Sequence, residues 1–270
     1  MSVLALVPFE LRRVLRRPWV QVGAAAGVLI AIVAVVVAAT HEDLAREDSL
    51  RRSTASLLLL GGLVLAVCLG SAALNRDAHG GHLGMLLGNG ASRSQLVGGS
   101  LGARLLVLLL VVAAWTAAMQ IGSVALGMGL DGPLAVHALA VAEGLALAMI
   151  ACAAASAVVA PVAAGIFGVS VFVIAQASVN LKAAADQDLI GTADTAVTAL
   201  YRIGPRTVTS PMIADMQLRD VAGPSAPRIE INDNTVFVPA AGWDTVVWTL
   251  LWCVLIALLC VAGMRRRPVN

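Results

Sequence analysis

Six apolar segments, each long enough to cross a lipid bilayer, constrain this chain more than any other feature of its sequence. A helix needs about 20 residues to cross about 30 Å of hydrocarbon, because it rises about 1.5 Å per residue. Of the 270 residues, 59% are hydrophobic and only 13% are charged, which leaves too little polar surface for a globule in water. The sequence therefore predicts an all-α polytopic membrane protein with six transmembrane helices, over residues 20–39, 53–74, 96–129, 133–159, 161–180 and 245–264.

The division between the fourth and fifth segments depends on a proline. The stretch from Pro133 to Asn180 is 48 residues long, which is too long for one crossing. Proline lacks a backbone donor and disfavours helix in the residue before it. We therefore expect the chain to break at Ala160-Pro161 and to form two helices there.

Arginines at the two ends of the apolar region predict the orientation of the chain. Four precede the first segment and three follow the last, and basic residues favour the cytoplasmic side: Arg12, Arg13, Arg16, Arg17, Arg265, Arg266 and Arg267. Both termini are then cytoplasmic, which requires an even number of spans. The prediction places loop 75–95 and tail 265–270 inside, and loop 41–52 and segment 181–244 outside.

The cellular location follows from two further observations. The first apolar core is longer than that of a cleaved signal peptide, and the basic segment before it is extended. Lys182 is the only lysine among 18 basic residues, a bias typical of a GC-rich genome. We therefore expect a multi-pass protein of the bacterial cytoplasmic (inner) membrane.

Residues 1–19 are predicted to form an amphipathic elbow helix in the cytoplasmic membrane interface. Leu4, Val7 and Leu11 recur at helical spacing, while Glu10 and the arginines occupy the other side. Pro18 suits the first turn of the span that follows. The alternative is a basic flank that only sets the topology.

The two longer loops have local signals of their own. In loop 75–95, a short helix carrying Leu83, Leu86 and Leu87 is predicted to end at Gly88–Gly90, with Ser92 capping the next helix. In the small extracytoplasmic segment 181–244, a helix is expected over 183–200, interrupted near Gly191. Two alternating runs further along, Arg228–Ile231 and Thr235–Val238, predict a β-hairpin.

Motifs for catalysis and cofactor binding are missing from the sequence. It contains no GxxxxGK[ST], HExxH or CxxC pattern. His79, His82 and Asp77 lie close together in sequence but supply too few ligands to predict a metal site. The four cysteines fall in apolar runs and read as buried hydrophobes: Cys68, Cys152, Cys253 and Cys260. A net charge of +2 gives no indication of nucleic-acid binding.

Glu143 is the most informative single residue, because it stands in the middle of the fourth segment. A charge at that depth costs about 2.5–3.5 kcal/mol on insertion scales and normally faces protein or a wet cavity. Glu143 could line a translocation pathway, or it could be a hydrogen-bonded glutamate that fixes helix packing. His137 is six positions away, roughly 240° around the helix, so the two do not share a face. Arg104 is expected to snorkel to the cytoplasmic interface, and Gln120 and Gln176 to join helices.

Two stretches resemble the ABC-2 type transporter permease family. The segment from Phe9 to Pro18, followed by a span, looks like the family's elbow helix. The stretch from Arg76 to Gly99, with Asp77, Leu86-Leu87 and Ser92-Arg93, is similar to the loop after the family's second span. It differs at three places, where the family often has glutamate (Gly80–His82), proline (Gly90) and lysine (Ser100).

The resemblance implies a permease subunit, usually of an exporter, that dimerises with a second copy or a homologous permease. It implies a partner ABC ATPase that binds ATP and Mg, with no cofactor and no enzymatic activity in this chain. The candidates for coupling to that ATPase are Glu10, Arg12, Arg13, Asp77, Leu86, Leu87 and Arg93, and Glu143 is the pathway candidate. The alternatives are a membrane scaffold or signalling partner working through segment 181–244, and an intramembrane enzyme using Glu143 with His137 or His41.

Overall fold

The fold was analysed in a computed structural model, which describes residues 3–41, 43–71, 73–74, 92–185, 193–207, 228–231, 234–237 and 243–265. Within these residues the chain is almost entirely helical. In chain order the elements are α1 (Val3–Leu15), α2 (Pro18–Ala39), α3 (Asp43–Ser56), η1 (Leu57–Gly61), α4 (Gly62–Ser71), α7 (Arg93–Ala125), α8 (Gly132–Ser156), α9 (Pro161–Ala185), α10 (Asp194–Ile203), β1 (Arg228–Ile231), β2 (Asn234–Phe237) and α12 (Trp243–Arg265).

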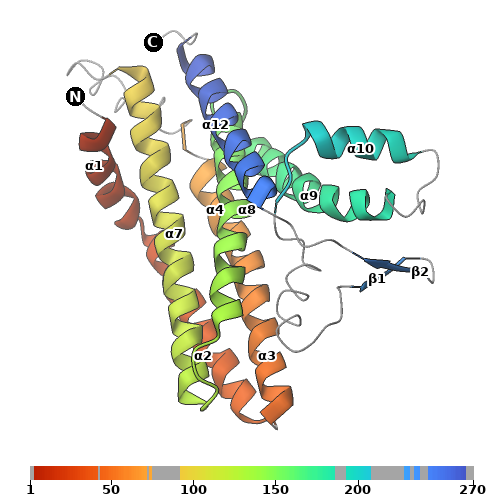
Figure 1. Cartoon of the computed structure of the whole chain (residues 1–270). Helices are drawn as coiled ribbons and strands as arrows, with labels where there is room; N and C mark the ends of the chain where they lie inside the picture. Colours follow the sequence, from red (N-terminus) through yellow and green to blue (C-terminus); the bar gives the residue numbers. More distant parts are fainter. Residues whose placement is uncertain are drawn as a thin grey trace.

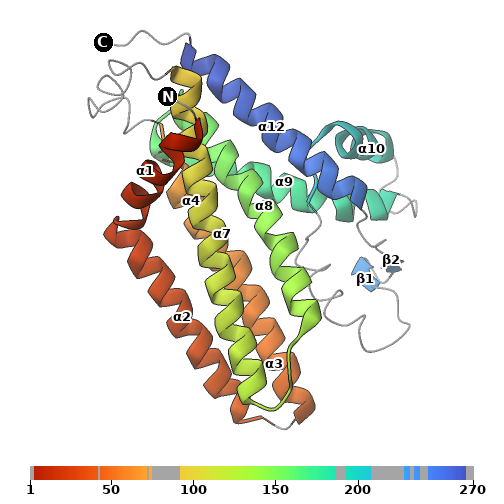
Figure 2. The same ribbon diagram turned by 60° about the vertical axis from the view of Figure 1, so that its left-hand side comes forward.

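Six of the described helices are long and apolar enough to cross a membrane, which confirms the number predicted from the sequence. Helices α2, α3–η1–α4, α7 and α8 run side by side, whereas α9 and α12 cross them obliquely (Figures 1 and 2). Helix α8 packs against α4, α7, α9 and α12, so it lies at the centre of the bundle. The start of α1 and the end of α12 lie at the same end of the bundle (Figure 1), as an even number of crossings requires.

The second spanning helix begins earlier than predicted. Residues 41–52 were expected to form a loop, but α3 starts at Asp43 and continues through the π-helical turn η1 into α4. Hydropathy predicts which part of a helix lies in the bilayer. It does not predict where the hydrogen-bonded helix begins or ends. Acidic residues such as Asp43 and Glu47 favour the N-terminal turns of a helix, so a polar helix can extend beyond the apolar one.

The third spanning helix ends earlier than predicted, at Ala125 instead of 129. Gly127 and Gly129 adopt positive φ angles of 79° and 76°, a conformation that few other residues tolerate. The break between the fourth and fifth spans is confirmed, because α8 ends at Ser156 and α9 begins at Pro161. Small residues allow these two helices to approach closely. A Cβ on Gly168 would lie 2.9 Å from the carbonyl oxygen of Ala148.

The first and last spans present most of their side chains outward. Only 22% of the residues in the apolar part of α2, and 17% in that of α12, are buried inside the protein. The exposed residues of both helices are mainly valine, leucine and isoleucine. Such faces suit lipid or another apolar helix and do not suit water. They fit the membrane environment that the composition predicts.

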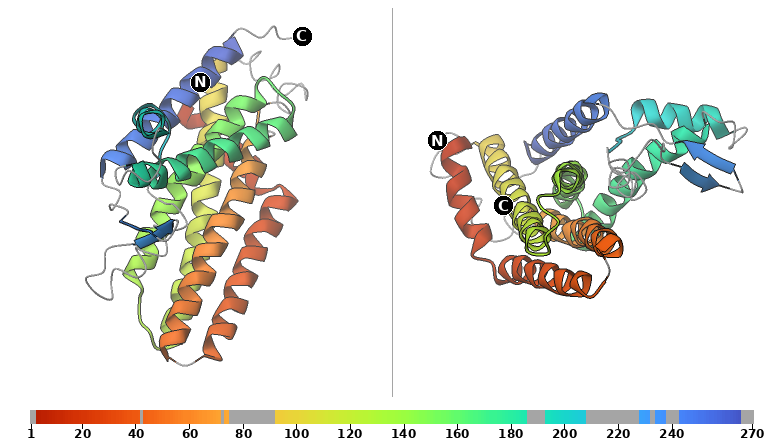
Figure 3. Two further views of the ribbon diagram at one scale, coloured as in Figure 1. Left: turned by 90° about the vertical axis from the view of Figure 1, so that its right-hand side faces the viewer. Right: turned by 60° about the horizontal axis from the view of Figure 1, so that its bottom comes forward.

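The region between α9 and α12 contains a helix and a hairpin. The helix expected over 183–200 is divided: α9 continues to Ala185 and α10 covers Asp194–Ile203. Helix α10 packs on α9, and both lie to one side of the bundle (Figure 3). The hairpin is confirmed, with β1 antiparallel to β2 and Ile231 paired with Asn234, so the second strand begins one residue earlier than predicted.

Candidate functional site

Helix α1 is seated on the first turns of α7. Leu6 and Val14 of α1 are each only 1% exposed. A Cβ on Gly99 of α7 would lie 2.8 Å from Cβ of Leu6, and one on Gly102 would lie 3.5 Å from Cγ2 of Val7. The two glycines therefore form a shallow seat in which α1 rests. The ribbons of α1 and α7 lie next to each other in Figure 3.

Glu10 lies on the buried side of α1, and its predicted place on the polar side was wrong. It stands four residues from both Leu6 and Val14, so the three share one face. Its carboxylate is paired with Arg13 at 3.3 Å, and the residue is 5% exposed. Of the predicted coupling arginines, Arg12 is exposed and Arg13 is half-buried.

The start of α7 is held by a capping box. The Ser92 hydroxyl accepts a hydrogen bond from the Gln95 backbone N–H, and the Gln95 side chain accepts one from the Ser92 N–H. The cap predicted at Ser92 is thus confirmed. Arg93, the first residue of α7, is half-buried beside it. The other predicted coupling residues, Asp77, Leu86 and Leu87, lie outside the described residues, as do His79, His82 and the short helix predicted around Leu83.

Arg104 connects α7 to the end of α4. The expectation that it snorkels to the interface was wrong, because the residue is only 1% exposed. Its guanidinium donates to the carbonyl oxygen of Ala73 at 3.1 Å and to the hydroxyl of Ser100. Helix C-termini leave carbonyl groups unpaired, and a cation satisfies both those groups and the negative end of the helix dipole.

Ser156 connects the same turn to α8. The Leu74 N–H donates to the Ser156 hydroxyl at 3.3 Å, and that hydroxyl donates to Ala153 within α8. The residues that flank segment 75–91 are therefore fixed to helices α4, α7 and α8, and α1 is seated on α7. A displacement of α1 or of the segment ends can pass directly to α4, α7 and α8.

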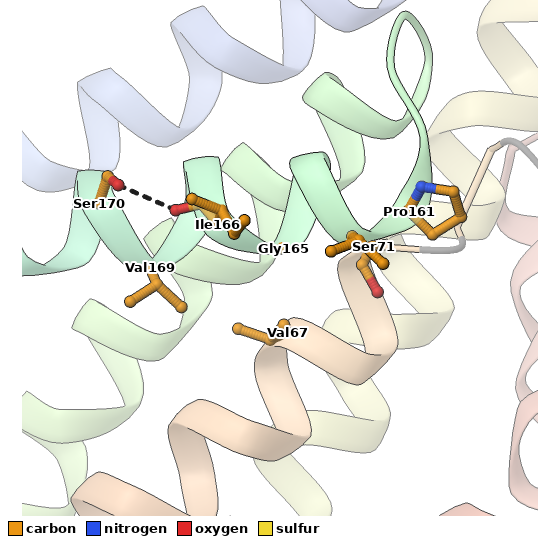
Figure 4. Close-up of a pocket in the computed structure, with 8 residues that line it drawn as sticks. Val67, Ser71, Pro161, Gly165, Ile166, Val169 and Ser170 are labelled. Atoms are coloured by element: carbon orange, nitrogen blue, oxygen red, sulfur yellow. Dashed lines mark hydrogen bonds between the residues drawn. The ribbon is translucent and has the colours of Figure 1, made fainter.

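Helices α4 and α9 border an apolar groove of about 510 Å³ (Figure 4). Val67 and Ser71 line it from α4, and Val162, Ile166 and Val169 line it from α9. Ser170 at its edge donates its hydroxyl to the Ile166 carbonyl at 2.9 Å, so that group is already satisfied. Such a lining, apolar apart from the Ser71 hydroxyl, suits an acyl chain.

Glu143 faces α12 from the middle of α8. Its carboxylate lies beside the hydroxyl of Thr249 and near the thiol of Cys253. One carboxylate oxygen, Oε1, is buried and has no hydrogen-bond partner among the described residues. All three residues fall within candidate membrane spans.

A short non-helical strap, residues 204–207, is inserted between α9 and α12 next to Glu143. Its Gly204 carbonyl accepts from the indole N–H of Trp248 at 2.8 Å, and its Arg206 carbonyl accepts from the Thr249 hydroxyl. On the other side, its Thr207 N–H donates to the carbonyl of Ala175 in α9 at 3.3 Å. We call Glu143, Gln176, Thr249 and strap 204–207 the polar seam.

Two further polar residues that the sequence singled out are His137, which is buried, and Gln120, which is half-buried. His137 is 1% exposed, and neither ring nitrogen has a partner among the described residues. Gln120 does join structural elements as predicted: its amide donates to the Asp131 carbonyl at 2.6 Å and accepts from the Asp131 N–H at 2.9 Å. Within the residues that the structure describes, no three His, Cys, Asp or Glu side chains are grouped to hold a metal ion.

The strap and the Arg51–Asp131 ion pair were missed in the sequence. The ion pair, at 2.7 Å, joins residues 80 positions apart, so local spacing carries no sign of it. The strap had a weak signal in Gly204-Pro205, a helix-ending pair followed by a polar run just after an amphipathic helix. Comparison of the sequence with models of known protein families and with curated proteins gives no match.

Proposed function

We propose that this chain is the permease subunit of an ABC-2 type transporter, acting as an exporter driven by ATP hydrolysed in a separate ATPase subunit. The observation that carries the proposal is the seat of α1 on α7. It places the N-terminal helix on the first turns of α7, the helix that follows directly after segment 75–91, and that segment resembles the family's coupling loop.

The contacts around this seat support a mechanical role. A partner that pushes on α1 or on segment 75–91 acts on Ala73 and Leu74 at one end and on Ser92 at the other. Arg104 and Ser156 tie the first end to α7 and α8, so the force reaches three spanning helices at once. Rigid-body displacement of packed helices is an established way to convert a local event into a change of access.

The proposal includes the partners and the location. ATP and Mg bind to the ATPase, and this chain supplies no catalytic group. A second permease copy, or a homologous permease, completes the transporter, and the outward apolar faces of α2 and α12 are suited to contact it or lipid. The complex lies in a bacterial cytoplasmic membrane with both termini of this chain inside.

Purification of the full chain from its native membranes in mild detergent tests the proposal. We expect a P-loop ATPase, identified by mass spectrometry, to be recovered with it in near-stoichiometric amount. Reconstituted vesicles containing both subunits should hydrolyse ATP, and a Walker A lysine substitution in the ATPase should abolish transport. Recovery of the folded chain without any P-loop ATPase, both from membranes and after co-expression with ATPases encoded beside it, would overturn the proposal.

A further inference from the structure

The polar seam contains more hydrogen-bonding capacity than the described residues use. Gln176 is 6% exposed, and neither its amide oxygen nor its amide nitrogen has a partner among them. Oε1 of Glu143 and both ring nitrogens of His137 are also buried and have no hydrogen-bond partner among the described residues. An unpaired buried polar group costs about 1–3 kcal/mol, so several in one region point to something that pairs with them.

Helix register brings these residues toward one another along α8 and α9. Gly168 of α9 contacts Ala148 of α8, and Gly144 of α8 contacts Phe172 of α9. The two helices therefore pack antiparallel, and the residue numbers of each facing pair add up to 316. Continuing one turn along α9 places Gln176 opposite Ala140. Ala140 lies one helical turn before Gly144 and one turn after His137 in α8. Gln176 and His137 therefore lie about one turn apart along the α8–α9 interface, and Glu143, the residue before Gly144, faces α12 at the same level of α8.

Strap 204–207 gives a second, independent sign of a site. Non-helical backbone at membrane depth occurs where it is buried in protein or lines a polar cavity, because lipid cannot satisfy its N–H and C=O groups. Here Thr207 is fully buried and bonded to α9, and both helices that flank the strap fall within candidate spans. Interrupted backbone within the membrane is a common construction of substrate and ion sites in transporters.

The seam holds one carboxylate, Glu143, and one guanidinium, Arg206, and these two described residues are not paired with each other. Arg206 is the cation of the strap, but its guanidinium lies over the rings of Tyr201 and Trp248, at 4.5 and 5.2 Å from their centroids. The neighbours of Glu143 on α12 are the Thr249 hydroxyl and the Cys253 thiol, and Glu143 forms no ion pair with another described residue. The ring of Phe172 lies over Gly144, the residue that follows Glu143. Its Cε2 atom would be 3.1 Å from a Cβ placed on Gly144.

We infer that the polar seam binds an organic ammonium ion, with Glu143 as counter-ion, Gln176 and Thr249 as hydrogen-bonding groups, and Phe172 as an aromatic wall. A carboxylate with an adjacent ring is suited to an ammonium group, which needs an anion and tolerates a ring face. The inference rests on the proposed function, for which it names the class of cargo: amine-containing molecules that carry a positive charge.

Binding to the purified full chain in detergent micelles tests the inference without any ATPase. The probe is phenethylammonium, and its neutral analogue is 2-phenylethanol, which has a similar shape and the same ring. We expect the cation to bind wild-type protein more tightly than the alcohol. Glu143→Gln should weaken binding of the cation by about tenfold or more, as loss of a charged hydrogen-bond partner does, and leave the alcohol unaffected.

Matched variants make the result specific. Asp244→Asn removes an exposed carboxylate from the start of the same helix α12 and should leave binding unchanged. Gln176→Leu keeps the size of the side chain and should weaken phenethylammonium binding severalfold. This variant tests the inference if the Glu143→Gln protein does not fold. Equal affinity for the cation and the alcohol in wild type, or unchanged cation binding in every folded seam variant, would overturn the inference.

The outcomes also separate the two proposals. If no ATPase associates but the cation binds through Glu143, the site stands and the transporter assignment fails. If an ATPase associates and the cation does not bind, the permease assignment stands and the cargo belongs to another class.

Discussion

Arg104 is a fully buried charge whose partner is the end of a neighbouring helix. It donates to Ala73 and Ser100, so its guanidinium closes the last turn of α4. Arg104→Ala removes the guanidinium that donates to the buried Ala73 carbonyl and deletes a large buried side chain. We expect it to lower the free energy of unfolding by at least about 1–3 kcal/mol, the cost of an unsatisfied buried group. Unfolding of the purified protein with SDS, followed by circular dichroism, measures the change.

Two further variants serve as controls for the predicted effect of Arg104→Ala. Arg104→Lys keeps a cation and a donor and should recover part of the loss, although it lacks the fork geometry of arginine. Arg202→Ala removes an exposed arginine from α10 and should change stability by no more than about 0.5 kcal/mol. An Arg104→Ala protein as stable as wild type would show that the contact with α4 contributes nothing.

Trp115 fills a notch that only glycine permits. Its indole N–H donates to the Ala24 carbonyl at 3.1 Å, and a Cβ on Gly27 would overlap the indole ring. Gly27→Ala should therefore separate α2 from α7 and destabilise the protein by about 1–3 kcal/mol, as overpacking does. Gly23→Ala, one turn earlier on the same helix, has open space around its Cβ and should be neutral or stabilising by up to about 1 kcal/mol. SDS unfolding of the two variants side by side tests this, and equal effects would contradict it.

At the scale of elements, α1 is the part that the proposed function most needs in place. Gly99→Leu puts a branched side chain where Cβ alone would already lie 2.8 Å from Leu6, so α1 should leave its seat. We expect the six-helix bundle to remain folded, with the helical content of wild type, and the recovery of a partner ATPase to fall at least severalfold. Gly102→Ala adds only an ordinary contact at 3.5 Å and should leave recovery unchanged. If ATPase recovery from the Gly99→Leu protein equals that from wild type, the α1 seat has no part in docking.

Elements are also the scale at which the sequence was most informative. The six spans, the break at Pro161, the Ser92 cap and the β-hairpin all follow from local patterns of hydropathy and turn residues, and the structure confirms them. The polar helix α3 could not be predicted from hydropathy, which reports the solvent around a segment and not its backbone hydrogen bonds.

The candidate site was only partly predictable. Glu143 was found because a charge in an apolar run violates the local rule. Its neighbours Thr249 and strap 204–207 are ordinary polar residues more than 60 positions away in the chain, and only the packing of α8, α9 and α12 brings them together. Glu10 shows the opposite failure: an amphipathic pattern assigned it to water, whereas the Arg13 ion pair allows its burial.

At the scale of the whole molecule, six spans and termini at one end fix a topology that can be tested directly. The predicted topology, with the arginine-flanked ends inside, places the short α7–α8 connection around Gly127–Leu130 and the α10 region outside the membrane. Both are exposed in the structure, since Leu130 is 80% and Ile203 71% accessible, so a cysteine placed at either position can react with a reagent in water.

We therefore expect single cysteines in a background with Cys68, Cys152, Cys253 and Cys260 replaced by alanine or serine to separate into two classes in intact cells. Leu130→Cys and Ile203→Cys should react with a membrane-impermeant maleimide added outside. Arg12→Cys, exposed on α1, should react only after the membrane is permeabilised. Labelling of the permeabilised cells confirms that each cysteine is accessible. Arg12→Cys reacting from outside while Leu130→Cys is protected would invert the chain, placing α1 and segment 75–91 on the side of the membrane where no ATP-driven partner could reach them.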